Sequence, residues 1–180
     1  MMLEPISEKH VIILTADDFE DTELLFPYFR LLEEGIAVDI VGPQKGAIHG
    51  EHGYSINIQK TFNEIDPAHY DLLILPGGSP NGAPMTVRKN AKALEIAKAF
   101  ADTGKPIAAI CHGPYTLISA GLVKGRRMTS YWGDGVPEEL KNAGAIYEDS
   151  EVVADGNLVT SRYPMDLPAF MRETMKLIRK

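Results

Sequence analysis

The sequence predicts an α/β fold, in which an open and mostly parallel sheet lies between layers of helices. Two observations indicate this fold: short continuous apolar runs alternate with longer segments of helical periodicity, and turn residues separate them. The 180 residues fall within the usual size of one domain. Because we find no repeat, low-complexity tract or linker, we expect a single domain over residues 1–180.

The first elements form a strand–helix–strand unit. Val11–Leu14 is an apolar run too short for a helix and is typical of a buried strand. Residues 20–34 follow with apolar residues at helical spacing, and Gly35 stands at the expected C-cap. Ala37–Val41 is the second strand. The short connections require a parallel pair with a right-handed crossover.

The rest of the chain continues this alternation. Glycine punctuation and alternating apolar residues predict a small hairpin over residues 46–58. Buried strands are predicted at 71–75 and 106–110, and helices at about 86–102 and 114–120. The last part of the chain predicts short strands near Met128, Ile146, Val152–Val153 and Leu158–Val159, and a final helix from about Leu167 to Lys180.

Composition and charge exclude several classes of protein. The chain has 18 basic and 25 acidic residues, a net charge of −7, and no basic stripe, so we expect no nucleic-acid partner. A single cysteine excludes an internal disulfide and a multi-thiolate metal site. No signal peptide and no apolar stretch of membrane-spanning length are found, so we expect a cytoplasmic protein without a membrane partner. The His49-x-x-His52 pair is too short and glycine-rich to indicate a metal site.

The chemistry is expected where three strands end. In open α/β sheets, ligands bind beyond the carboxyl ends of the strands, where the loops converge. The three loops are Asp18–Glu20, Pro76–Gly78 and Cys111–Pro114. We therefore expect them to face one pocket.

Cys111 is the candidate nucleophile. It stands between a strand of small and β-branched residues and a helix that Gly113-Pro114 opens, so the chain must turn sharply and present the side chain above the sheet, as in a nucleophile elbow. The helix N-terminus is expected to lower the thiol pKa, so that the thiolate is populated at neutral pH. A lone cysteine is more often plain core, but a core thiol gains nothing from this position.

Two neighbouring features have structural and functional interpretations. Glu20 is expected near the start of the first helix, where a carboxylate stabilises the helix dipole; Asp17, Asp18, Asp21 and Glu23 could do the same, so spacing alone does not select it. Gly77-Gly78 is a common turn and lacks the residues of a phosphate loop. Its functional alternative is a pair of amides that approach an oxyanion beside the thiol.

The motifs resemble a known family along almost the whole chain, from Val11 to Ile178. The chain is similar to the PfpI-like branch of the class I glutamine amidotransferase-like superfamily, which includes intracellular cysteine peptidases, protein and nucleotide deglycases and glyoxalase III enzymes. This resemblance implies a flavodoxin-like sheet. The motifs that carry it are Phe19-Glu20-Asp21 with Pro27-Tyr28, Leu75-Pro76-Gly77-Gly78, Ala109–Pro114, Leu117–Gly121, Gly125-Arg126-Arg127, Thr129-Ser130-Tyr131 and Ser161-Arg162.

The resemblance also implies roles for individual residues. Cys111 would be the nucleophile, His112 its base, and Glu20 the carboxyl that hydrogen-bonds the sulfur. The amides of Gly78 and His112 would stabilise an oxyanion, and Tyr131 would line the pocket. Gly77 and Gly113 are added to the candidate substrate and oxyanion site. No metal or organic cofactor is implied.

Assembly and the missing acid follow from the same resemblance. Members of this branch form dimers, trimers or hexamers, so we expect a homo-oligomer. In the peptidases a glutamate from the adjoining subunit completes a Cys-His-Glu triad within an Ala-Pro-Glu stretch. This chain has Ala83-Pro84-Met85 there, after an apparent insertion at 79–82. Methionine cannot orient the imidazole as a carboxylate does, so peptidase activity is disfavoured.

The predicted function is therefore a cysteine-dependent, hydrolase-like enzyme of the deglycase or glyoxalase III type. A reactive dicarbonyl or its adduct is easier to attack than an amide. Its expected partners are a small dicarbonyl or a glycated protein or peptide. The alternatives are an intracellular cysteine peptidase or amidase of PfpI type, and a noncatalytic oxidative-stress sensor or chaperone, because a low-pKa exposed thiol forms sulfinic acid readily.

Overall fold

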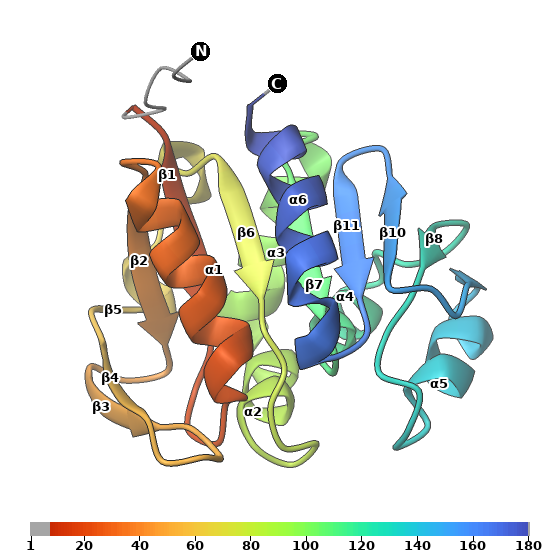
Figure 1. Cartoon of the computed structure of the whole chain (residues 1–180), viewed down its shortest axis with the longest axis horizontal. Helices are drawn as coiled ribbons and strands as arrows, with labels where there is room; N and C mark the ends of the chain where they lie inside the picture. The colour runs from red at the N-terminus through yellow and green to blue at the C-terminus, as the bar shows by residue number, and fades with distance from the viewer. Residues whose placement is uncertain (1–7, 180) are drawn as a thin grey trace.

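The computed structural model describes residues 8–179 and shows a central sheet with helices on both faces (Figure 1). The strands of this sheet are β1 (His10–Leu14), β2 (Ala37–Gly42), β5 (Lys60–Thr61), β6 (Leu72–Leu75), β7 (Ile107–Ile110), β10 (Val152–Asp155) and β11 (Leu158–Ser161). Their order is β10-β11-β7-β6-β1-β2-β5, and only the β10–β11 pair is antiparallel. The predicted open, mostly parallel and flavodoxin-like sheet is confirmed.

The helices form the outer layers. In Figure 1, α1 and α6 lie in front of the sheet, and α3 and α4 lie behind it. The helices are α1 (Asp21–Glu33), α2 (Ala83–Lys89), α3 (Ala91–Asp102), α4 (Pro114–Ser119), α5 (Val136–Asn142) and α6 (Leu167–Ile178), with 3-10 turns at Phe62–Glu64, Pro67–His69 and Pro164–Asp166. Two small sheets complete the fold, β3 (Gly46–His49) with β4 (Ser55–Ile58), and β8 (Arg127–Met128) with β9 (Ile146–Tyr147).

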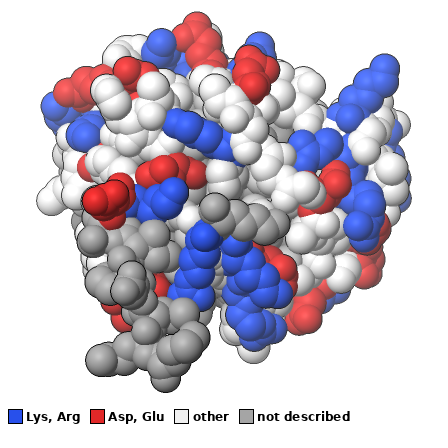
Figure 2. All heavy atoms as spheres, turned by 90° about the horizontal axis from the view of Figure 1, so that it is seen from above, with Lys and Arg blue, Asp and Glu red and all other residues white. Residues whose placement is uncertain are grey.

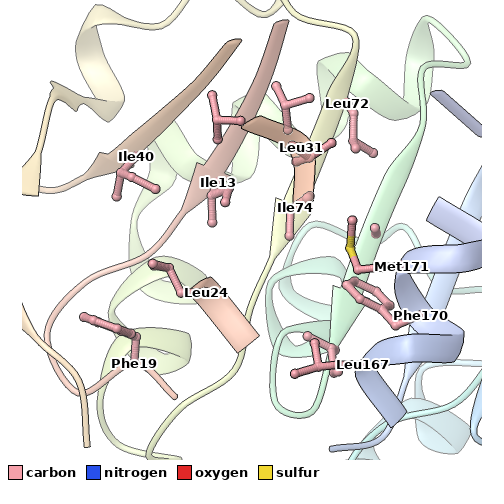
Figure 3. Close-up of a cluster of buried hydrophobic side chains, with 14 of the residues drawn as sticks. Ile13, Phe19, Leu24, Leu31, Ile40, Leu72, Ile74, Leu167, Phe170 and Met171 are labelled. Carbon is pink, nitrogen blue, oxygen red and sulfur yellow. The ribbon is translucent and has the colours of Figure 1, made fainter. Parts of the chain in front are cut away.

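Each face of the sheet has its own apolar core. In the core drawn in Figure 3, Leu24 and Leu31 from α1 and Phe170 from α6 pack over Ile13 and Ile74 of the sheet. All five side chains are fully buried, and each contributes on the order of 2 kcal/mol from burial. Because both faces are covered, the inner strands are apolar throughout rather than alternating.

The helix predicted over residues 86–102 is two helices. Asn90 separates α2 from α3 with an extended backbone (φ −89°, ψ 117°). Its side chain accepts hydrogen bonds from the amides of Lys92 (3.0 Å) and Ala93 (3.1 Å), which caps α3. Helix α5 was not predicted, because its seven residues are too short for a clear apolar period.

The predicted hairpin is confirmed as β3–β4, and it brings its tip to the carboxyl end of the sheet. Gly50 forms a bridge with Phe19, and the amide of Glu51 donates to the carbonyl of Phe19 (2.9 Å). The tip therefore lies beside the loop that leads into α1. Among residues 8–179, we find no helix long and apolar enough to cross a lipid bilayer.

Candidate active site

Cys111 lies in a strained turn between β7 and α4. Its φ of 63° is in the left-handed region, which non-glycine residues rarely adopt. The turn is held from both sides: the Cys111 amide donates to the carbonyl of Ser161 (3.1 Å), and the Cys111 carbonyl accepts from Tyr131 (3.0 Å). A side chain on Gly113 would collide with the carbonyl of Leu75, so only glycine lets the chain turn here. This is the geometry expected of an elbow.

The carboxyl beside the sulfur belongs to Glu23. Glu23 is fully buried, and its Oε2 accepts a hydrogen bond from the amide of Gly77 (2.8 Å). A Cβ on Gly77 would lie 2.5 Å from that oxygen and 2.7 Å from Cys111 Cβ, which shows how closely the three residues approach. The other oxygen, Oε1, is buried and receives no N–H or O–H donor from the described residues, so the thiol of Cys111 is the group left to hydrogen-bond this carboxyl. Glu23 therefore presents a buried carboxyl group to the thiol.

Glu20, which was expected at the sulfur, is not brought to it. Its side chain caps α1: Oε2 accepts hydrogen bonds from the amide of Glu23 (2.8 Å) and the hydroxyl of Thr22 (2.6 Å). Its Oε1 faces the imidazole of His52 at 3.6 Å. Since the N-cap side chain must turn back toward the first helical amides, it cannot also reach Cys111. The expectation that Glu20 hydrogen-bonds the sulfur is wrong, and Glu23 occupies that place.

His112 lies between the thiol and a carboxylate from its own chain. Its Nδ1 is 3.3 Å from Cys111 Sγ, and its Nε2 is 2.9 Å from Oδ2 of Asp134. A carboxylate can only accept, so Nε2 carries a proton and Nδ1 is free to accept the thiol proton. The chain thus forms a Cys111–His112–Asp134 series in which each member contacts the next.

A short glycine-flanked loop presents Asp134. Asp134 and Gly135 both have left-handed backbones, with φ of 55° and 75°. The hydroxyl of Tyr115 donates to the Asp134 carbonyl (3.2 Å), and the amide of Val136 donates to Gly133 (3.2 Å). The loop is therefore fixed from α4 and from its own turn. Met85 is not among the residues that line the pocket around Cys111.

The backbone amides expected to bind a substrate oxyanion differ in whether they are free to donate a hydrogen bond. The amides of Gly77 and Gly113 are already used, by Glu23 Oε2 and by the carbonyl of Ile110 (2.8 Å). They cannot donate to a substrate, so that part of the expectation is wrong. The Gly78 amide has no acceptor among the described residues, and Gly78 lines the pocket with His112. The φ of 147° at Gly78 requires glycine.

Burial dominates the electrostatics of the site. The pKa of the Cys111 thiol is raised well above its usual range, first by burial and then by the charge of Glu23, while the His112 amide lowers it. The pKa of Glu23 is also raised well above its usual range, by burial and by Glu20. Both shifts favour the protonated forms of the pair, a direction opposite to the expected lowering of the thiol pKa. Burial lowers the pKa of His112 although Asp134 opposes this, so the imidazole is neutral and can act as a base.

These groups line a cavity of about 290 Å³, to which Tyr131, Tyr163 and Glu51 also contribute. Tyr131 therefore lies where it was expected. A larger hollow of about 370 Å³ lies at the opposite end of the strands, beside Lys9 and Lys105, but its wall contains no cysteine or histidine. We identify the cavity at Cys111 as the candidate active site.

The sequence analysis did not identify two residues of this site, Glu23 and Asp134. The helical period could have found Glu23, because it shares the buried face of α1 with Leu24, Pro27 and Leu31. Nothing in the sequence places Asp134 near His112. Its only signal is a left-handed turn indicated by the flanking glycines Gly133 and Gly135.

Comparisons with known proteins show the family of the chain. The profile of the DJ-1/PfpI family matches residues 9–177. A protein from Pyrococcus furiosus named "Deglycase PfpI" is 52% identical over 169 residues, which cover 94% of this chain and 99% of that protein. A Bacillus subtilis protein named "Putative cysteine protease YraA" is 40% identical and covers 95% of this chain and 99% of the relative.

A solved structure gives the same fold. The crystal structure of Drosophila melanogaster DJ-1beta superposes with a TM-score of 0.85 and is 27% identical. The match covers 96% of this chain and 92% of that one.

Proposed function

Because the chain belongs to the DJ-1/PfpI family, we propose that it is a cysteine-dependent deglycase that acts on dicarbonyl adducts in the cavity at Cys111. The observation that carries this proposal is the in-chain contact series from Cys111 through His112 to Asp134, with Glu23 on the other side of the sulfur. This arrangement supplies a nucleophile, a base, a group that orients the base, and a second carboxyl.

The first step is attack on an aldehyde carbon. In the cavity the adduct breaks its carbon–nitrogen bond, its hydroxyl proton moves to the departing amine, and the aldehyde of the bound dicarbonyl re-forms. His112 Nδ1 takes the proton from Cys111, and the thiolate forms a carbon–sulfur bond with that aldehyde carbon. The carbonyl oxygen accepts the electron pair and then the proton from the imidazolium. We propose that the amides of Gly78 and His112 stabilise this oxyanion, since both residues line the cavity.

The second step moves one proton between neighbouring carbons. Glu23, as a carboxylate, takes the proton from the carbon bonded to sulfur while the adjacent ketone oxygen gains a proton from water, which gives an enediol. Glu23 then returns its proton to the former ketone carbon, which becomes an alcohol, and the hydroxyl on the first carbon gives its proton back to water as that carbon becomes a thioester. The burial of Glu23 beside the thiol and its raised pKa suit a group that alternates between carboxylate and acid. Water then hydrolyses the thioester. In sum, adduct and water give the free amine and a 2-hydroxy acid, and no external oxidant is needed.

A matched pair of variants tests this function. Turnover of methylglyoxal and of a methylglyoxal–arginine adduct would be measured for wild type, Cys111→Ser and Glu23→Gln. We expect both variants to lose at least about 100-fold in kcat. Undiminished turnover by Cys111→Ser would remove the mechanism.

Peptide hydrolysis is the second candidate, because Asp134 supplies the orienting carboxylate that Met85 lacks. No acid from another subunit is then needed for a Cys-His-Asp triad. Fluorogenic peptides assayed with the same preparation separate the two activities. Peptide turnover above dicarbonyl turnover would favour the peptidase.

Assembly and location complete the proposal. We propose a homo-oligomer, because three large apolar side chains on α1 are exposed: Phe26 by 42%, Phe29 by 54% and Leu32 by 40%. Light scattering of Phe29→Glu tests this, with a smaller particle expected. We propose the cytoplasm as the compartment, since the mechanism needs a reduced Cys111.

A further inference from the structure

Arg88 has the smallest exposed fraction, 15%, of the arginine side chains that form ion pairs among residues 8–179. It lies in the last turn of α2, at the carboxyl ends of the strands (Figure 1), but it is not among the residues that line the cavity at Cys111. Figure 2 shows many other Lys and Arg side chains on the opposite face, at the amino ends of the strands. Because burial of a charged group is costly unless the group is paired, the partners of Arg88 indicate its role.

The guanidinium of Arg88 joins two other helices. Its Nη1 and Nη2 donate to the two carboxylate oxygens of Glu139 on α5, with Nη1 at 3.2 Å from Oε2. Its Nε donates to the hydroxyl of Ser119 on α4 (2.9 Å), and its Cζ lies 4.3 Å from the centroid of the Tyr115 ring on the same helix. The planar fork of arginine can hold a carboxylate and an aromatic face at the same time. Arg88 therefore ties α4 to α5.

The two helices that Arg88 joins begin beside the two residues of the imidazole–carboxylate contact. Helix α4 begins two residues after His112, and α5 begins two residues after Asp134. The amide of Glu139 closes the first turn of α5, so a group that holds Glu139 also holds the start of this helix. On the other side, the hydroxyl of Tyr115 donates to the carbonyl of Asp134 (3.2 Å). The guanidinium therefore supports the loop at Asp134 both through α5 and through the Tyr115 ring.

The side chain of Asp134 itself has little other support. It is 46% exposed, and His112 is its only hydrogen-bond partner among the described residues. Its backbone is left-handed (φ 55°), a conformation that a non-glycine residue keeps only where the surrounding structure enforces it. The 2.9 Å contact with His112 therefore depends on where the loop is held rather than on packing around the carboxylate.

We propose that Arg88 is a positioning residue for the reaction, which sets the contact between His112 and Asp134 by clamping α4 to α5. This inference rests on the proposed function for the role of His112 as the base, but the contact that it concerns can be measured without substrate. Arg88 acts only through these other residues, since it does not line the cavity. A misplacement of about 1 Å caused by a substitution away from the reacting atoms can cost about 100-fold in rate. Loss of the clamp is therefore expected to lower kcat.

A double-mutant cycle with Asp134→Asn separates positioning from a general structural role. Methylglyoxal turnover would be measured for wild type, Arg88→Gln, Asp134→Asn and the double variant. We expect Arg88→Gln to lower kcat by about tenfold and to change KM by less than about twofold, because Arg88 does not contact the substrate. In the Asp134→Asn background the same substitution is expected to lower kcat by less than about twofold, because the contact is already lost. An equal loss in both backgrounds, or no loss in either, would overturn the inference.

Titration of His112 gives a second readout, whose sign distinguishes positioning from charge. The groups that face the imidazole are Asp134, the Cys111 thiol, the rings of Tyr115 and Tyr131, and the backbone of Gly78. Burial lowers the pKa of His112, and Asp134 raises it. Removal of a nearby positive charge alone would raise this pKa, whereas loss of the Asp134 contact lowers it. We expect NMR of ¹⁵N-labelled histidines to show a lower His112 pKa in Arg88→Gln than in wild type, and an unchanged or higher pKa would overturn the inference.

Two further variants control for net charge and for folding. Arg126→Gln removes another partly buried guanidinium, which pairs with Asp155 (2.9 Å) and lies outside the cavity wall, so it is expected to retain both kcat and the pKa of His112. A loss in Arg126→Gln as large as that in Arg88→Gln would overturn the inference. If Arg88→Gln does not fold, Glu139→Gln breaks the same clamp at a side chain that is 39% exposed. It is expected to lower kcat by about as much, and a folded Glu139→Gln without loss would overturn the inference.

Methylglyoxal turnover by the wild type distinguishes this inference from the proposed function. Turnover together with an unlowered His112 pKa in Arg88→Gln leaves the function standing and overturns the inference. If the wild type shows no turnover, the proposed function fails, and the titration of His112 alone decides the role of Arg88.

Discussion

Replacing Asp134 by asparagine tests the orienting role of this residue within the chain. Asparagine tolerates the left-handed backbone of position 134 (φ 55°) and keeps the side-chain volume, so the loop is expected to retain its shape. The charge is lost, and the amide can also donate to His112 Nε2, which would place the imidazole proton on Nδ1, where it blocks acceptance of the thiol proton.

The magnitude follows from the contact. Two opposite unit charges about 4 Å apart interact by about 4 kcal/mol at an effective dielectric constant of about 20. The Asp134 side chain is 46% exposed, so we discount this by half, to about 2 kcal/mol or roughly 30-fold in rate. Stabilisation of the wrong tautomer adds about tenfold. We therefore expect kcat/KM to fall between about 30-fold and about 300-fold.

The assay is kcat/KM for methylglyoxal from pH 5 to 9. Asp134 raises the pKa of His112 against the larger lowering effect of burial. Its removal lowers that pKa further, so the acid limb of the profile, which reports protonation of the base, moves to lower pH. Asp102→Asn, at the exposed end of α3, is the charge-matched control. A loss of less than threefold, or an acid limb that does not move, would refute the orienting role.

Further predictions concern the rest of the site and the fold. Gly77→Ala places a Cβ 2.5 Å from Glu23 Oε2 and 2.7 Å from Cys111 Cβ. We expect the free energy of unfolding, measured in urea, to fall by about 1–3 kcal/mol and kcat to fall at least about tenfold. Unchanged values would show that the wall is loosely packed. Because burial raises the pKa of Glu23 in the folded protein, the contribution of this residue to stability is full below a pH of about 4.5 and is lost as the pH rises through the folded pKa. Glu23→Gln is therefore expected to have a larger free energy of unfolding than wild type, by a margin that grows from about pH 4 to about pH 8. A margin that shrinks with pH would contradict the raised pKa of Glu23. Met85→Leu is expected to change kcat less than twofold, because Asp134 already orients His112; a large loss would mean that the segment carrying Met85 completes the site. Asn90→Ala removes the cap of α3 and is expected to cost about 1 kcal/mol of unfolding free energy, whereas no loss would show that the break between α2 and α3 is set by packing.

The sequence predicted the sheet well because its strands are buried on both faces and are therefore read as continuous apolar runs, such as Leu72–Leu75 and Ile107–Ile110. The turn at Cys111 was predicted for a related reason. When a strand ends in Cys-His-Gly-Pro directly before a helix, the backbone can connect the two elements only by a sharp turn. The φ of 63° at Cys111 shows how sharp this turn is.

To predict which acidic residue near the start of α1 faces Cys111, one must know which side chains the helix turns toward the sheet. A cap and an inward-facing residue lie only three positions apart, at Glu20 and Glu23. The resemblance selected Glu20, whereas the buried face of α1 contains Glu23 with Leu24 and Leu31. The apolar period of the helix therefore indicates Glu23, whereas the family motif indicated Glu20.

The acid at position 134 depends on long-range packing. Asp134 approaches His112 across 22 residues, because α4, α5 and the Tyr131 loop pack together at one end of the sheet. The thiol pKa likewise depends on burial, which the position of Cys111 before a helix does not reveal. Local sequence gives the turn, but only the folded structure gives the dielectric environment of the sulfur.

Mass spectrometry of the enzyme during turnover tests the central claim most directly. Wild type would be mixed with excess methylglyoxal, quenched in acid within a turnover and digested. We predict that the peptide containing Cys111 gains the mass of one methylglyoxal, that the gain disappears as substrate is exhausted, and that Cys111→Ser shows neither the adduct nor turnover. Turnover with no transient mass on that peptide, or with the mass on a lysine or arginine side chain instead, would contradict covalent catalysis by this cysteine.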